Sequence, residues 1–62
     1  MTQYGVVVNT GKRIIVKANK VFETGSFLVF QKTVHGLNGA EDAFETVAWF
    51  PVSNIQYVEK RR

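Results

Sequence analysis

Residues 47–59 read VAWFPVSNIQYVE and carry the strongest structural signal in the chain. The apolar run Val47 to Phe50 leads into Pro51, and a second apolar-rich run begins at Ile55. β-Branched and aromatic residues favour strands, whereas proline cannot continue the hydrogen-bond ladder of a central strand. This stretch therefore predicts a strand, a short turn at Pro51 to Asn54, and a final strand.

Upstream of this ending, short β-branched or aromatic runs separated by turn residues predict further strands. The first covers residues 3–9 and meets the second, residues 13–18, at a hairpin turn that ends with Gly11 and Lys12. The third covers residues 27–34. Residues 19–26 carry polar turn signals around one Val-Phe pair, so they are predicted to form a connection.

The segment before residue 47 supports two interpretations. Ala43 to Phe50 is predicted to be the fourth strand, because its second half is β-prone. Asn38 and Glu41 have the spacing of a capping box, however, and favour a helical turn over residues 39–44. Residues 35–42 form the longest predicted loop, with two glycines. Five short strands at this spacing indicate an all-β small barrel or sandwich.

The ending also resembles known proteins. Phe50-Pro51, then Ile55 and Tyr57-Val58-Glu59, fit the pattern Phe-Pro-x-x-x-Ile-x-Tyr-Val-Glu, which ends a set of short, uncharacterised bacterial and phage all-β proteins. The same stretch is similar to the end of Src-homology-3-type barrels, in which one helical turn precedes the last strand. The resemblance covers residues 47–59. It implies an all-β, five-stranded Src-homology-3-like small barrel, and a fold more than a function.

The length of 62 residues allows one domain, which is predicted over residues 1–59 with a basic tail at residues 60–62. A composition of 45% hydrophobic and 21% charged residues is that of a folded chain. The formal net charge of +3 belongs to the tail, since the remaining five cations balance five anions. The charge balance therefore assigns polyanion affinity mainly to the tail.

Several protein classes are excluded by composition. The chain has no Cys, so it forms neither a disulfide nor a Cys-based zinc site. No apolar run approaches the ~20 residues of a membrane helix. The opening residues MTQY lack the positive charge and cleavage site of a signal peptide. We therefore predict a cytoplasmic protein without membrane association.

The predicted strands are apolar on both faces, although a small barrel buries only one face of each strand. A chain this short buries only about 60% of its unfolded surface, so self-association would add needed stability. Exposed apolar patches mark interfaces. We therefore predict a homo-oligomer; the alternative is that loops and the segment around Phe22 cover the second face. In strand 27–34 the odd- and even-numbered residues are equally apolar, so the sequence does not determine which face points inward. The predicted interface residues are Val7, Ile15, Val47 and Trp49.

Two glycine-containing segments are weak motif matches. Gly5 to Lys12 has one residue too many between its glycines for a phosphate loop, and a strand follows it where a helix is required. Gly36 to Gly39 matches the Gly-x-x-Gly of a nucleic-acid-binding domain in which this loop joins two helices. Neither context is predicted here, so both segments are interpreted as loops.

The titratable residues do not assemble a reaction centre in the sequence. His35 has no nucleophile or second base arranged around it. Glu41, Asp42 and Glu45 lack the spacing of a calcium loop and are interpreted as a solvated acidic rim. We therefore predict no catalytic residues, no metal site, no cofactor and no enzymatic activity.

Binding remains as the predicted function. The principal hypothesis is a homo-oligomeric accessory or inhibitor protein that binds a partner protein or a small ligand. The alternative is a small barrel that binds nucleic acid without sequence preference, through its basic hairpin and tail. A third hypothesis is a structural domain that assembles into a larger particle. The predicted ligand or nucleic-acid contacts are Lys12, Arg13, Lys17 and His35.

Overall fold

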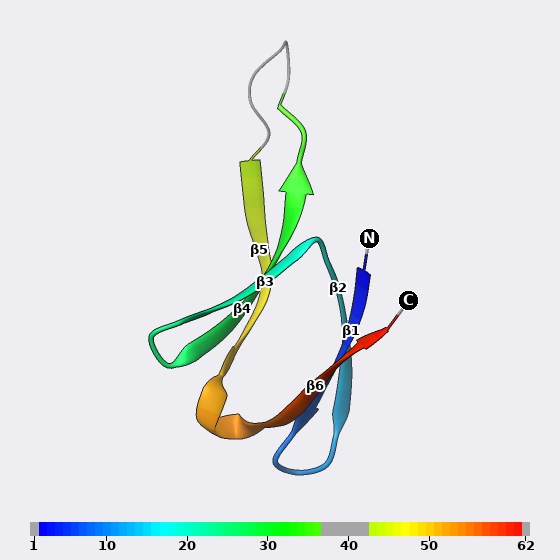
Figure 1. Ribbon diagram of the computed structural model, residues 1–62, viewed down its shortest axis with the longest axis vertical. Helices are drawn as coiled ribbons and strands as arrows, with labels where there is room; N and C mark the ends of the chain where they lie inside the picture. The colour runs from blue at the N-terminus through cyan, green and yellow to red at the C-terminus, as the bar shows by residue number, and fades with distance from the viewer. Residues whose placement is uncertain (1, 37–42, 62) are drawn as a thin grey trace.

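The computed structural model describes residues 2–36 and 43–61, and strands account for nearly all of its regular structure (Figure 1). The all-β prediction is confirmed, and so is the short helical turn before the last strand. Within these residues no helix is long and apolar enough to cross a membrane. In chain order the elements are β1 (Thr2–Val8), β2 (Arg13–Ala18), β3 (Lys20–Thr24), β4 (Phe27–Val34), β5 (Ala43–Pro51), the 3-10 turn η1 (Val52–Asn54) and β6 (Ile55–Arg61).

The strands form two antiparallel sheets of three strands each, with the orders β2-β1-β6 and β3-β4-β5. Among the described residues no ladder joins β5 to β6, so the sheets do not close into a barrel. Residues 43 and 44 belong to β5, and not to a helical turn; the rest of the alternative helical segment, residues 39–42, lies outside the described residues.

The sequence predicts five strands, whereas six lie within the described residues, because the segment predicted as a connection contains β3. Only Asn19 separates β2 from β3, and here the chain passes from one sheet to the other (Figure 1). The Asn19 N–H donates to the Gln31 carbonyl at 2.9 Å, and the Thr33 N–H donates to Asn19 Oδ1 at 2.8 Å. The asparagine thus continues the pairing with β4 while the backbone bends, so a polar turn residue forms a corner.

Phe30 lies at the centre of the core between the sheets. It is fully buried, as is Val6 on the facing sheet. The rings of Tyr4 and Phe50 lie with their centroids 5.4 and 5.9 Å from that of Phe30. Aromatic pairs at this separation prefer tilted or edge-to-face geometry, as both pairs show. The buried cluster consists of Val6, Val8, Val16, Ala18 and Phe30.

The two ends of β1 explain the predicted hairpin and the length of the last strand. The Val8 N–H donates to the Lys12 carbonyl, and Gly11 takes the left-handed conformation (φ 88°) that such a hairpin turn requires. At the other end, β6 continues past the predicted boundary at Glu59, because Arg61 pairs with Gln3. Part of the predicted basic tail is therefore strand.

The corner at Asn19 gives a stability prediction. We expect Asn19→Ala to lower the free energy of unfolding by about 1 kcal/mol, because it removes the acceptor of the Thr33 N–H. Urea unfolding followed by the fluorescence of Trp49, the single tryptophan, measures this change. Asn19→Asp keeps an acceptor oxygen and is expected to keep most of the stability. Equal stability of Asn19→Ala and wild type would contradict the assigned role.

Candidate functional site

The buried position of Phe30 decides which side chains face outward. Side chains alternate along a strand, and Leu28 points with Phe30 into the core. Phe27 and Val29 therefore lie on the outer face of the β3-β4-β5 sheet. This settles the orientation of β4, which the sequence left open.

The outer face of the β3-β4-β5 sheet is apolar. Phe22, Val29 and Trp49 are cross-strand partners and form one row across the three strands. Trp49 is 55% exposed and Phe27 is 46% exposed, and their rings meet edge-to-face with centroids 6.4 Å apart. Large exposed aromatic side chains in one patch are typical of an interaction surface. We call Phe22, Phe27, Val29 and Trp49 the apolar face.

A lysine borders the apolar face. The Lys20 ammonium lies 5.2 Å from the centroid of the Phe22 ring and 4.8 Å from that of Phe44. Both distances are within the range of cation–π attraction. Phe44 is itself 53% exposed, so the aromatic surface continues toward the far end of β5. The Lys20 cation beside the apolar face thus lies against aromatic rings.

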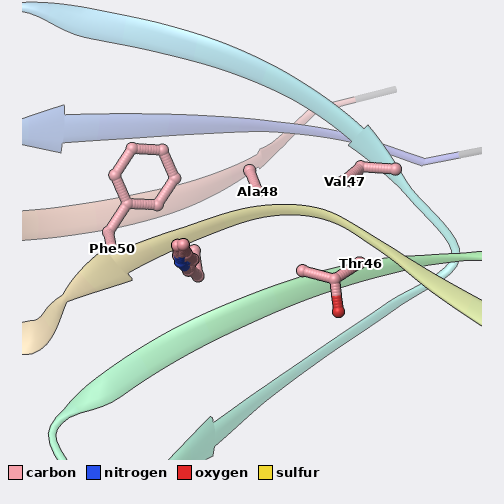
Figure 2. Close-up of a pocket in the computed structure, with 5 residues that line it drawn as sticks. Thr46, Val47, Ala48 and Phe50 are labelled. Atoms are coloured by element: carbon pink, nitrogen blue, oxygen red, sulfur yellow. The ribbon is translucent and has the colours of Figure 1, made fainter.

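A β-bulge in β5 changes the orientation of Val47. Phe30 pairs with Ala48 and Gln31 pairs with Thr46, which leaves Val47 as the extra residue. Figure 2 shows Val47 on the same side of β5 as Ala48 and Phe50, with Thr46 on the other side. Val47 therefore does not share a face with Trp49, contrary to the simple alternation assumed from the sequence.

A hollow runs along β5 at Thr46 to Phe50 (Figure 2). It is open to solvent, and this single strand supplies all the residues that line it. Sites that bind small molecules usually enclose most of the ligand between several elements. The hollow is therefore better suited to contact with a protein surface than to enclosure of a small molecule.

The outer face of the β2-β1-β6 sheet has a different chemistry. Cross-strand pairing places Arg13, Val7 and Tyr57 in one row, and Lys17, Gln3 and Arg61 in another. Between these rows lies a third, with Gly5 at its centre. We call this surface the charged face; its residues are Gln3, Gly5, Val7, Arg13, Ile15, Lys17, Tyr57, Glu59 and Arg61.

An ion pair crosses the middle of the charged face. Glu59 Oε1 lies 3.0 Å from Arg13 Nε, with Gly5 between their strands. A Cβ at residue 5 would lie 2.8 Å from the same Glu59 oxygen. Gly5 is therefore required for a close approach: its missing side chain lets the Glu59 carboxylate lie across β1.

The four predicted interface residues do not form one surface. Val7 is only 5% exposed, between its neighbours Arg13 and Tyr57, so its predicted exposure was wrong. Ile15 is 46% exposed on the charged face, whereas Trp49 belongs to the apolar face. Because the two sheets pack through their inner faces, these outer faces point away from each other.

The predicted ligand contacts are also divided. Lys12 is exposed in the β1–β2 turn, and Arg13 and Lys17 lie on the charged face. His35 directly follows β4. Along the long axis, β4 ends on the side opposite the β1–β2 turn (Figure 1). The structure therefore groups the three cations near one sheet and separates His35 from them.

Sequence reasoning missed several members of both faces. The sequence pattern does not decide the orientation of Phe27, because the odd- and even-numbered residues of β4 are both apolar. It predicts a connection at Phe22, where the structure has β3. Tyr57 and Arg61 join the cations only through the pairing of β6 with β1. Tyr57 and Arg61 pair with residues fifty or more positions away, and such pairing leaves no local signal in a single sequence.

Within residues 2–36 and 43–61, no group of three or more His, Asp or Glu side chains could hold a metal ion. Glu41 and Asp42 of the predicted acidic rim lie outside these residues. No protein-family model, curated protein or solved structure matches the chain.

The close approach at Gly5 gives a second prediction. A double-mutant cycle with Arg13→Gln and Glu59→Gln is expected to show a coupling of about 0.5 kcal/mol, typical of an exposed ion pair. In a Gly5→Ala background the coupling should vanish, because the new methyl group displaces the carboxylate. Urea unfolding of the eight proteins provides the measurement. Equal coupling in both backgrounds would contradict this role of Gly5.

Proposed function

We propose that this chain is a non-enzymatic binding module that acts as a homo-oligomer through its apolar face. The observation that carries the proposal is the exposure of Trp49 and Phe27 in edge-to-face contact on one sheet face. Buried aromatic anchors contribute most of the energy of many protein interfaces. An accessory or inhibitor protein that binds a partner protein fits this surface.

The proposal also includes the fold, which we describe as an open Src-homology-3-like barrel. Because Asn19 alone separates β2 from β3, these two strands count as one bent strand shared by both sheets, and the strand number becomes five. The 3-10 turn Val52–Asn54 precedes the last strand, as in the family that the ending resembles. The open side between β5 and β6 is the departure from a closed barrel.

The charge distribution favours a second copy of this chain as the partner that covers the apolar face. An interface related by a two-fold axis brings the same surface of both copies together, so like charges on it would face each other. The charged face carries three cations and one anion, which would oppose such pairing. The apolar face itself carries no charged side chain, and neighbouring Lys20 lies against aromatic rings. Self-association is therefore assigned to the apolar face.

The small core supports the same assignment. Within the described residues the buried apolar side chains are Val6, Val7, Val8, Val16, Ala18 and Phe30. Domains of this size have a small margin of stability, and association is a common way to increase it. Covering Trp49 and Phe27 would bury two of the larger exposed side chains.

We expect Trp49→Ala to weaken self-association at least about ten-fold, because truncating an aromatic hot spot commonly costs more than ~1.4 kcal/mol. Trp49 is more than half exposed, so its loss leaves no cavity in the core and the fold should persist. Sedimentation equilibrium over a range of concentrations gives the dissociation constant, and circular dichroism checks the fold.

Ile15→Ala is the matched control, since Ile15 is 46% exposed but lies on the charged face. It should leave self-association unchanged. A wild-type protein that remains a single chain at every concentration would refute the homo-oligomer. Equal weakening of self-association by both variants would contradict the assignment of the interface to the apolar face. Open-ended association would favour a structural role in a larger particle.

A further inference from the structure

The charged face has a geometry that self-association through the apolar face does not use. Lys17 and Arg61 flank Gln3 on neighbouring strands, so their Cα atoms are about 10 Å apart. Arg13 lies on the same side of β2 as Lys17, about 13 Å along the strand. Three exposed cations thus occupy three corners of a small patch.

The fourth corner is aromatic. Tyr57 shares a row with Arg13 across Val7, and it is 50% exposed. Its neighbour along β6 on this face is Glu59, and Arg61 follows. Proteins that bind single strands of nucleic acid combine cations that follow the phosphate backbone with exposed aromatic rings on which bases stack. The patch presents both components on one sheet face.

The Glu59 carboxylate occupies the centre of this patch. It lies across Gly5 and is bound to Arg13, within the one row that separates the two rows of cations. A phosphate group that approached the centre would compete with this carboxylate for Arg13. The ion pair is exposed on both sides, with 49% and 39% of the side chains accessible, so solvent-borne anions can reach it.

We propose that the charged face binds the phosphate backbone of single-stranded nucleic acid, with Tyr57 stacking on a base and Glu59 acting as an internal competitor. The inference is independent of the proposed function, because it concerns the opposite outer face. Because the Glu59 carboxylate repels phosphate and occupies Arg13, removing its charge should strengthen binding.

Fluorescence anisotropy of a short labelled oligothymidylate tests the proposal. The wild-type protein should bind at low salt, and log Kobs should fall against log salt concentration with a slope of about −2, since each of three contacts contributes about −0.7. Lys17→Gln should weaken binding about five-fold and reduce the slope by about 0.7. Absence of binding at low salt would overturn the proposal.

Glu59→Gln tests the competitor role. It should strengthen binding about five-fold, the effect of one unscreened neighbouring charge in water. Gln keeps the size of the side chain, so the fold should be retained, and circular dichroism checks this. Unchanged or weaker binding by folded Glu59→Gln would overturn the role assigned to the carboxylate.

Lys20→Gln distinguishes binding by the charged face from attraction by the net charge of the protein. It changes the charge of the protein as much as Lys17→Gln does, but Lys20 lies beside the apolar face. It should leave the affinity unchanged. Equal weakening by the two lysine variants would show that net charge alone attracts the oligonucleotide, which would overturn the assignment.

Tyr57→Leu tests stacking while keeping a large side chain beside Val7. Loss of base stacking should weaken binding at least about five-fold. An unchanged affinity would overturn the role of Tyr57. Tighter binding to a duplex of the same length, or to phosphatidylserine vesicles, would overturn the choice of a single strand as the ligand.

Discussion

The inward position of the Phe30 side chain organises the packing of both sheets. This ring fills the space between the two sheets, where it meets Tyr4 and Phe50. Once it is inside, alternation places Leu28 inside and both Phe27 and Val29 outside. The apolar face is therefore a consequence of core packing: β4 has more apolar residues than one core can bury.

Two local departures from regular strands decide how the sheets relate and what they expose. Asn19 continues the pairing with β4 through its backbone N–H and its side chain while the backbone bends, which lets the chain pass directly from β2 in one sheet to β3 in the other. The bulge at Val47 shifts the pairing of β5, so Thr46 and Trp49 lie on the same face although they are three residues apart. Without that shift, Val47 would extend the apolar face.

The two outer faces divide the surface chemistry of a very small protein. One carries aromatic and aliphatic side chains with little charge, and the other carries three cations, an aromatic ring and one carboxylate. Gly5 has a specific part in this division, because its missing side chain lets Glu59 reach across β1 to Arg13. Because the two surfaces are separate, the proposed self-association and the proposed nucleic-acid binding would not compete for the same residues.

Local sequence features are enough to predict the all-β class, the first hairpin with its turn at Gly11, and the turn at Val52 to Asn54 before the last strand. These features follow from local causes: β-branched runs, glycine conformation and the proline at residue 51. The same local reasoning found the exposure of Trp49 and the cations of β2, which lie within single strands.

Long-range contacts were needed to establish four further features: the inward face of β4, the strand at Lys20–Thr24, the burial of Val7, and the separation of His35, which follows β4, from the cations near β2. Each depends on which strands pair and in what register. When the odd- and even-numbered residues of a strand are equally apolar, its own sequence favours neither face as the inward one. Contacts with distant strands then determine which face is buried.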